Sequence, residues 1–152
     1  MKTNVINADP KRKGINAQLM KSALKGAESV GAETQYVDLY KMKISGCRVC
    51  LICKNDEDVC KCYWRDELSP LIEDIFSCDC LLIGVPIFFS QPSSHYMALL
   101  EMLNGEVVID TFSNISKNMY ANKSEEEIKA KEEQFELDLE KVFDIAGRLS
   151  SK

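Results

Sequence analysis

The sequence lacks the features that define several protein classes. No segment approaches about 18 consecutive apolar residues, so we expect no membrane-spanning helix. Its 19 lysine and arginine residues are outnumbered by 24 aspartate and glutamate residues, and the net charge of −5 argues against a general affinity for nucleic acid or anionic membranes. The single histidine, His95, falls in a helical segment and is interpreted as a surface or interface residue rather than a metal ligand.

The chain also lacks a recognisable secretion signal and any sign of a second domain. Met1 leads directly into a short apolar stretch without the hydrophobic region of a signal peptide. Seven cysteines would suggest disulfides in a small secreted protein, but without a signal they are interpreted as reduced thiols or metal ligands in the cytoplasm. With 152 residues and neither repeats nor low-complexity linkers, residues 1–152 are expected to form a single domain.

Cysteine is concentrated in one loop, at residues 46–63. Three thiols recur at three-residue spacing and two more follow, so that sixteen residues contain Cys47, Cys50, Cys53, Cys60 and Cys62. Thiols at this spacing can surround one metal centre, which indicates a four-thiolate iron–sulfur cluster or a tetrahedral structural zinc. Either Cys60 or Cys62 can supply the fourth ligand. Reduced thiols without a metal are the alternative interpretation.

The spacing of apolar residues predicts alternating strands and helices. Short apolar or alternating runs predict strands at residues 3–8, 33–39, 80–87 and 106–112. The run at 80–87 is continuous, which is typical of a strand buried on both faces of a parallel sheet. Apolar residues three and four positions apart predict helices at 16–30, 68–76 and 94–103, and a long C-terminal helix. This alternation predicts a doubly wound α/β sheet.

Capping residues and apolar stripes refine the expected helices. Gly31 is expected just past the first helix, Ser69 and Pro70 as N-cap and first residue of the second, and Ser124 with Glu127 as a capping box for the last. The apolar stripes of the helices are expected to include Val30, Phe76 and, in the last helix, Ile128, Phe135, Leu139, Val142, Ala146 and Leu149.

Two loops leave the carboxyl ends of predicted strands, where an open parallel sheet binds its ligands. The loop 9–16 is basic and opens a helix, so its backbone N–H groups could hold a phosphate; a solvated basic turn is the alternative. In the loop 86–93, Phe88 and Phe89 could flank a flat heteroaromatic ring, or could simply cap the core. The residues alone leave both pairs of interpretations open.

Four motifs in order resemble the flavodoxin-like NAD(P)H-dependent FMN reductases. The segment 7–17 (NADPKRKGINA) is similar to their phosphate loop N-G-S-P-R-K-x-G-N-T-A. The segments 62–68 and 84–89 look like their C-V-x-x-D-D-M and G-S-P-V-Y-F motifs. The cysteine run resembles the C-x2-C-x2-C-x(4–7)-C motif of the iron–sulfur flavoprotein branch, a spacing that Cys60 fits, whereas Cys62 fits the downstream motif.

The resemblance covers about residues 2–103 and the last helix, and it implies a flavodoxin-like fold that binds FMN. The phosphate is then expected at Asp9, Lys11, Arg12, Lys13, Asn16 and Ala17, and the isoalloxazine ring at Pro86, Ile87, Phe88 and Phe89. In the iron–sulfur branch a [4Fe-4S] cluster lies near the flavin and passes single electrons. Because the protein positions and tunes the flavin, no side chain is expected to act as general acid or base.

The sequence departs from this family at several positions. Asp9 places a carboxylate where the family has a serine hydroxyl, which opposes a phosphate dianion unless a cation neutralises it, and Ile15 with Asn16 replaces Asn-Thr. Phe88 and Met97 replace a tyrosine and a lysine. Relatives have a further strand and helix before the last strand, so the domain is either abridged by one strand–helix unit or lacks residues between about Leu103 and Val107.

The resemblance therefore implies an FMN-binding oxidoreductase that passes electrons between NAD(P)H, or an electron carrier, and a small-molecule or protein acceptor. We expect a cytoplasmic homodimer or homotetramer, because relatives build their flavin sites at subunit contacts and both loops carry apolar residues. The alternative is a flavodoxin-like domain that has lost its cofactor and serves as a binding or structural subunit, supported by Asp9 and Ile15. A zinc-stabilised fold without redox function is the third hypothesis.

Overall fold

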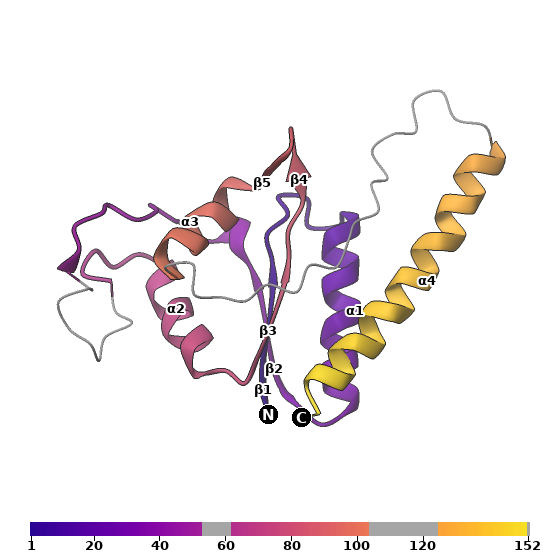
Figure 1. The fold of residues 1–152 in the computed structure, drawn as a ribbon, viewed down its shortest axis with the longest axis horizontal. Helices are drawn as coiled ribbons and strands as arrows, with labels where there is room; N and C mark the ends of the chain where they lie inside the picture. The colour runs from indigo at the N-terminus through magenta and orange to yellow at the C-terminus, as the bar shows by residue number, and fades with distance from the viewer. Residues whose placement is uncertain (53–61, 104–124, 152) are drawn as a thin grey trace.

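The computed structural model describes residues 1–52, 62–103 and 125–151 (Figure 1). The elements in chain order are β1 (Lys2–Asn7), α1 (Ile15–Ser29), β2 (Glu33–Asp38), η1 (Leu39–Lys41), α2 (Leu68–Ser77), β3 (Cys80–Gly84), β4 (Ile87–Phe88), β5 (Gln91–Pro92), α3 (Ser94–Leu103) and α4 (Glu125–Leu149).

A parallel sheet in the order β2-β1-β3 forms the centre of the described fold. At the end of β1, Asn7 pairs with Asp38 of β2 on one side and with Gly84 of β3 on the other. Parallel neighbours need long crossovers, and helices supply them here. Helices α1 and α4 lie on one face of the sheet and α2 and α3 on the other (Figure 1). The predicted doubly wound α/β architecture is confirmed.

Alternate residues of β1 face the two layers, because successive side chains of a strand point to opposite faces. Ile6 and Ala8 are fully buried in a cluster with residues of the α2 and α3 side: Leu39, Leu68, Leu71, Ile72, Ile75, Tyr96, Leu99 and Leu103. Val5 is buried on the other face, with Met20, Ala23, Val142 and Ala146 of α1 and α4. The sheet therefore has an apolar core on each face.

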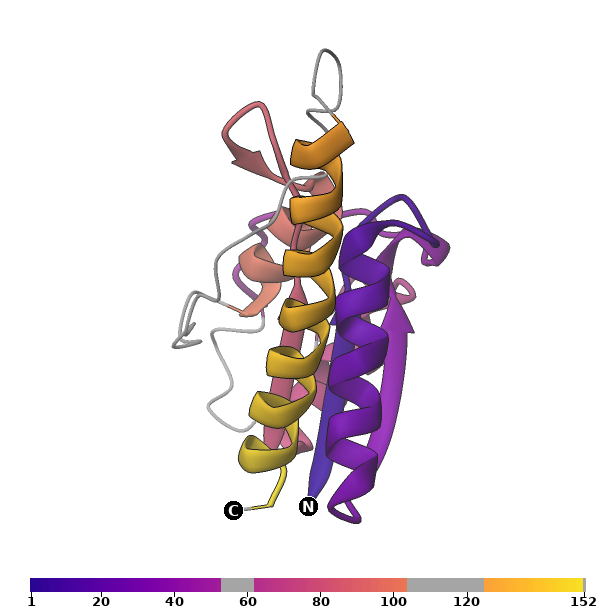
Figure 2. The same ribbon diagram turned by 90° about the vertical axis from the view of Figure 1, so that its right-hand side faces the viewer.

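Helices α1 and α4 lie side by side, as Figure 2 shows, and approach each other closely at Gly26. A Cβ atom built on Gly26 would lie 2.0 Å from the carbonyl oxygen of Phe143, so only glycine allows this contact. The Ser22 hydroxyl donates to the carbonyl of Leu139 at 2.7 Å, and this hydrogen bond joins the two helices at a second point. At the chain ends, the Thr3 hydroxyl donates to the Ser150 hydroxyl at 2.9 Å.

The helix ends confirm one capping prediction and correct another. Gly31 has a φ of +78° and donates to the carbonyl of Glu28 at 3.0 Å, which confirms its role past the end of α1. The prediction for Ser69 and Pro70 is wrong, because α2 already begins at Leu68. Asp66 caps this end: its carboxylate accepts the Leu68 N–H at 2.9 Å, and its own N–H donates to the Ser69 hydroxyl at 3.2 Å.

Two strands end earlier than the sequence predicts. Leu39 starts the short helix η1 instead of extending β2. The segment 80–87 splits, because β3 ends at Gly84 and Ile87 belongs to the β4–β5 hairpin. The prediction that both faces of this strand are covered is confirmed, because Leu81 and Ile83 pack against the core on the α2 and α3 side and Leu82 packs against the core on the α1 and α4 side, although residues 80–83 are only partly buried.

Some residues assigned to apolar stripes are exposed. Phe135, Val142 and Ala146 are buried as predicted, but Val30, Phe76 and Leu149 are exposed. Phe76 follows Ile75, whose side chain is buried against the sheet, so the helical turn of roughly 100° per residue rotates Phe76 away from it.

Several predictions lie outside the described residues. These are the strand at 106–112, the joint between Leu103 and Val107, and the Ser124 end of the capping box; the side chain of Ile128 is also not described. Across the described ranges, no helix combines the length and apolar character that crossing a membrane requires.

Candidate flavin site at the carboxyl edge of the sheet

The loops that follow β1 and β3 meet at the carboxyl edge of the sheet. The N–H of Ala8 donates to the carbonyl of Gly84 at 2.9 Å, which continues the strand pairing by one residue. The Ser93 hydroxyl, buried at the start of α3, donates to the carbonyl of Ala8 at 2.8 Å. The phosphate-loop candidate (residues 9–17), which begins just after Ala8, and the aromatic hairpin (residues 86–93) are therefore neighbours, as a shared ligand requires.

The phosphate-loop candidate is organised by Asp9. Its carboxylate accepts the backbone N–H of Lys11 at 2.8 Å, and its own N–H donates to the side chain of Asn7 at 3.3 Å. The N–H of Gly14 donates to the carbonyl of Lys11 at 2.9 Å and closes the loop just before α1 begins at Ile15. Gly14 has no side-chain cap, so the first turn of α1 is open to another acceptor.

The other predicted phosphate residues divide into a buried and an exposed group. Ala17 is buried in the first turn of α1. Asn16 has a buried Nδ2 atom without a hydrogen-bond partner in the described structure, and its Oδ1 lies 3.2 Å from the Cβ position of Gly84. An orphaned donor at this edge fits a phosphate or ribityl oxygen. Lys11, Arg12 and Lys13 are exposed around it.

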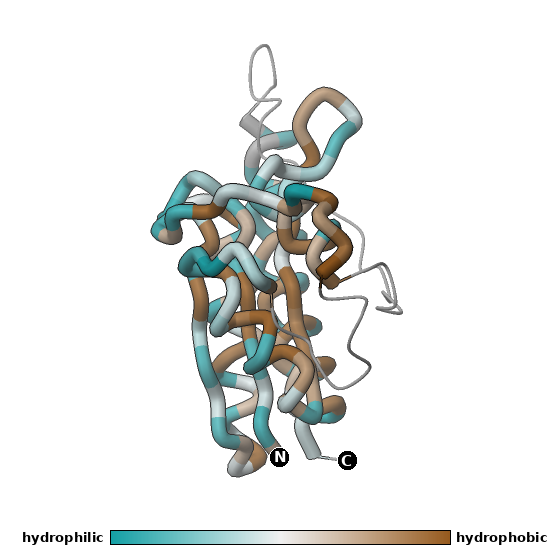
Figure 3. The backbone as a smooth tube through the Cα atoms, turned by 90° about the vertical axis from the view of Figure 1, so that its left-hand side faces the viewer, coloured by the Kyte–Doolittle hydropathy of each residue, from teal (hydrophilic) through white to brown (hydrophobic). Residues whose placement is uncertain are grey.

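The aromatic residues lie on a hairpin that projects from the body of the chain (Figure 3). Phe89 and Ser90 form its tip with φ values of 50° and 62°, and the Phe89 side chain is completely exposed. Ile87 is also exposed, whereas Pro86 and Phe88 are half-buried. The interpretation that both aromatic rings cap the core is wrong for Phe89.

The end of β2 adds an ionised carboxylate to the same edge. Asp38 accepts a hydrogen bond from Asn7 Nδ2 at 2.9 Å and pairs with Lys41 at 2.8 Å. Burial alone would raise the pKa of Asp38, but the hydrogen bonds from Lys41 and Asn7 outweigh it and lower the pKa. Burial, followed by the Asp38 charge, raises the pKa of Tyr36 to about 12. Asp38 is therefore charged and Tyr36 neutral at physiological pH.

A cluster at the start of α3 was missed by the sequence reasoning. The rings of Tyr40 and His95 stack, with centroids 3.9 Å apart and planes inclined by 21°. The Ser94 hydroxyl lies 3.3 Å from the Tyr40 hydroxyl and 3.4 Å from Nδ1 of His95. His95 therefore has a contact within its own chain.

The described part of the cysteine loop lies against α3. The N–H of Cys47 donates to a carboxylate oxygen of Glu101 at 3.4 Å, and the Arg48 guanidinium lies 4.6 Å from the centre of the Trp64 ring. The N–H of Val49 donates to the Cys47 sulfur at 3.4 Å. Cys50 is exposed, and Cys62 is half-buried. Cys53 and Cys60 lie outside the described residues, and the described ones contain no group of three or more metal-ligating side chains.

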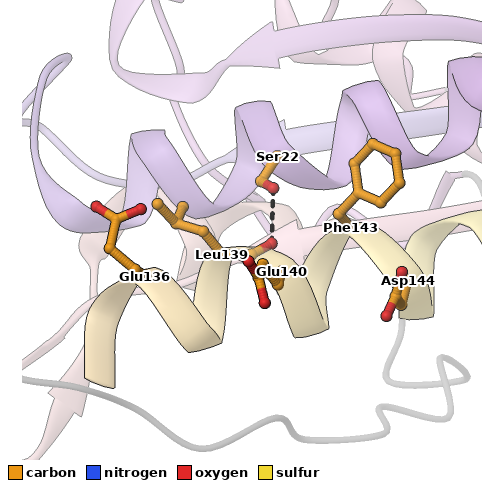
Figure 4. Close-up of a pocket in the computed structure, with 6 residues that line it drawn as sticks. All are labelled: Ser22, Glu136, Leu139, Glu140, Phe143 and Asp144. Carbon is orange, nitrogen blue, oxygen red and sulfur yellow. Dashed lines mark hydrogen bonds between the residues drawn. The ribbon is translucent and has the colours of Figure 1, made fainter. Parts of the chain in front are cut away.

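Two open grooves lie elsewhere, between α1 and α4. One, shown in Figure 4, has a volume of about 380 Å³ and is lined by Ser22, Glu136, Leu139, Glu140, Phe143 and Asp144. The other has a volume of about 440 Å³ and is lined by Gln18, Lys129, Glu132, Glu133, Phe135 and Glu136. Their carboxylates are exposed to solvent and disfavour an anionic cofactor, so the sheet edge remains the candidate site.

Comparison with known proteins identifies the family of the chain. Residues 1–124 match the family described as NADPH-dependent FMN reductase. The chain belongs to this family. Membership confirms the resemblance at the level of the reductase family, whereas the iron–sulfur branch stays a prediction. A search of the curated proteins finds no match.

Solved structures confirm the flavodoxin-like fold of this reductase family member. An azoreductase from Bacillus anthracis str. Sterne matches with a TM-score of 0.62 at 11% identity, covering 97% of this chain and 99% of its own. RosB with a bound riboflavin-phosphate intermediate matches with a TM-score of 0.55 at 24% identity. A flavone reductase matches with a TM-score of 0.53 at 21% identity. They cover 75% and 70% of this chain, which spans only 45% and 31% of their lengths.

Proposed function

We propose that the protein is a flavin-dependent oxidoreductase that uses FMN and NAD(P)H and transfers electrons to a small-molecule or redox-protein acceptor. The observation that carries the proposal is the buried, unpartnered Nδ2 of Asn16, which lies at the opening of α1 beside Gly84. A free donor there suits the phosphate or ribityl chain of a flavin. Family membership over residues 1–124 supports the same cofactor.

The residues of the chain would bind and shield the cofactor. Asn16 and the open first turn of α1 would donate to the phosphate end, with Lys11 and Arg12 at its rim. The half-buried Phe88 would contact the ring. Bound flavin supplies hydride acceptance from NAD(P)H and one- or two-electron transfer onward. No described side chain is needed as a general acid or base.

Removing two cations of the phosphate-loop candidate should weaken the binding of FMN. The double substitution Lys11→Ala, Arg12→Ala should lower the binding free energy by roughly 1–3 kcal/mol, the scale of charge-assisted hydrogen bonds. Riboflavin binding should change little, because riboflavin has no phosphate. Flavin fluorescence titration measures both affinities.

The matched control is Lys21→Ala, Lys25→Ala, which removes two exposed cations from the middle of α1. This control should keep the FMN affinity of the unsubstituted protein. An equal loss of FMN affinity in both double variants would mean that the loss comes from the change in net charge alone. The phosphate would then not bind at this loop.

A domain that has lost its cofactor remains the second candidate function. The specific observation in its favour is Asp9, whose carboxylate already accepts a hydrogen bond within the loop expected to bind phosphate. Such a protein would serve as a binding or structural subunit. Failure of every flavin to bind would favour it over the reductase.

We further propose that the cysteine loop holds a four-thiolate centre, with a [4Fe-4S] cluster preferred to zinc. Its support is the spacing of Cys47, Cys50 and Cys53 and the N–H of Val49 that donates to the Cys47 sulfur at 3.4 Å. Positive φ angles at Val49 and Leu51 curl the described part of the loop, and hydrogen bonds to sulfur tune such clusters.

Protein made without oxygen and supplied with iron and sulfide should contain stoichiometric iron and acid-labile sulfide. Serine at Cys47, Cys50 or Cys53 should abolish the centre, and Cys60→Ser and Cys62→Ser should differ and so identify the fourth ligand. Cys78→Ser, at a half-buried position between α2 and β3, is the control and should retain the centre. Absence of iron and sulfide from the unsubstituted protein would reject the cluster, and zinc in their place would favour the structural alternative.

The protein should associate at least into dimers in the cytoplasm. Large apolar side chains are exposed on the cysteine loop and on the hairpin: Val49, Leu51, Ile52, Tyr63, Trp64, Ile87 and Phe89. Apolar surface gathered in this way is typical of an interface. Light scattering should give a mass of at least twice the 17.2 kDa of one chain, and Phe89→Asn should reduce it. A single species near one chain mass would reject the dimer.

A further inference from the structure

We infer that Asp9 makes the phosphate loop discriminate against flavins that carry a 5′-phosphate. Riboflavin, whose ribityl chain ends in a hydroxyl group, should therefore bind at least as tightly as FMN. The inference rests on the proposed flavin site and specifies which flavin that site prefers. Asp9 thus acts as a specificity-determining residue.

The Asp9 carboxylate is held inside the loop. The residue is only 8% exposed, although it lies among exposed basic residues. Its Oδ1 accepts the backbone N–H of Lys11 at 2.8 Å, and its backbone N–H donates to Asn7 Oδ1 at 3.3 Å. Asn7 is in turn bonded to Asp38, so the position of Asp9 is fixed from the sheet.

The second carboxylate oxygen lies at the opening of α1. Oδ2 of Asp9 is 2.9 Å from the Cβ position of Gly14, the N-cap residue, so a side chain at Gly14 would collide with it. The positive end of a helix favours an anion at this place. Here the chain itself supplies an anion near that end of the helix.

The ion pairs Lys2–Asp74 and Asp38–Lys41 do not include Asp9, and the neighbouring cations Lys11, Arg12 and Lys13 are exposed to solvent. A phosphate dianion beside Asp9 would bring like charges together and would compete for the N–H of Lys11. A ribityl hydroxyl can instead donate a hydrogen bond to the carboxylate. The same geometry therefore opposes FMN and accepts riboflavin.

The test is a fluorescence titration of the full chain with riboflavin and with FMN. Asp9→Asn keeps the size of the side chain and an oxygen for the Lys11 N–H, but it removes the charge. The matched control is Asp79→Asn, because Asp79 also accepts a backbone N–H, from Lys2 at 2.7 Å, at the opposite end of the sheet. Asp9→Ser restores the hydroxyl of the family motif and serves as a second variant.

We expect the unsubstituted protein and Asp79→Asn to bind riboflavin at least as tightly as FMN. Asp9→Asn and Asp9→Ser should bind FMN at least tenfold more tightly, with less than a threefold change for riboflavin. The inference fails if the unsubstituted protein binds FMN tenfold more tightly than riboflavin. It also fails if both Asp9 variants leave the ratio of the FMN and riboflavin affinities unchanged. In either case the proposed flavin function is unaffected. If neither flavin binds to any variant, the proposed flavin function fails with it.

Discussion

Replacing Gly26 by alanine should lower the free energy of unfolding by about 3 kcal/mol, the upper range for overpacking a closely packed site. The added Cβ would lie 2.0 Å from the carbonyl oxygen of Phe143 and 2.8 Å from its carbonyl carbon. Both atoms belong to the backbone, so no side-chain rotation relieves the collision. Helices α1 and α4 would have to separate. Urea unfolding followed by circular dichroism measures the loss.

Gly147→Ala is the matched control for this change. It is also a glycine-to-alanine substitution in the same helix pair, but its Cβ would lie 3.2 Å from the carbonyl oxygen of Gly26. Alanine gains about 1 kcal/mol of helix propensity at either position. That gain should nearly offset the milder crowding at Gly147, so this variant should remain about as stable as the unsubstituted protein. Equal stability of the two variants would contradict the α1–α4 contact.

Two asparagines of β1 should respond to valine in opposite directions. Asn4 is fully buried, and neither polar atom of its side chain has a hydrogen-bond partner in the described structure. An unsatisfied buried polar group costs roughly 1–3 kcal/mol, so Asn4→Val should stabilise the fold by about 1 kcal/mol or more. The midpoint of urea unfolding should rise accordingly.

Asn7→Val provides the comparison within the same strand. Asn7 is equally buried, but its side chain donates to Asp38 at 2.9 Å and accepts the Asp9 N–H at 3.3 Å. Its loss removes one hydrogen bond of Asp38, which keeps its pairing with Lys41, and leaves the Asp9 N–H without this acceptor, so stability should fall by about 2 kcal/mol. Both substitutions raise β-propensity alike, so the difference between their free energies of unfolding reports the hydrogen bonds of the two asparagine side chains. A loss of stability in Asn4→Val as well would show that Asn4 has a partner beyond the described residues.

The fold was largely predictable because its local and global signals agree. The alternation of strand and helix patterns determined the order of elements, and Gly31 marked the end of α1 correctly. Propensity did not determine where β3 ends, because the chain leaves the sheet at Gly84 to build the hairpin. A continuous apolar run does not indicate how many neighbours a strand has.

The candidate site was predictable in place but not in detail. The position of Asp9 after β1 located the loop, and its carboxylate was expected to oppose a phosphate. Its hydrogen bond to the Lys11 N–H and its contact with Gly14 depend on backbone geometry that composition does not reveal. The stack of Tyr40 on His95 joins residues far apart in the sequence, so no local pattern could indicate it.

The most direct test of the central claim is an anaerobic titration of the protein with flavin, followed by NADPH and NADH in turn. The account predicts saturable quenching of flavin fluorescence at one flavin per chain, and loss of the yellow flavin absorption when a reduced nicotinamide is added. Flavin that stays fully fluorescent at every protein concentration would contradict the flavin site. Bound flavin that neither nicotinamide reduces would contradict the reductase.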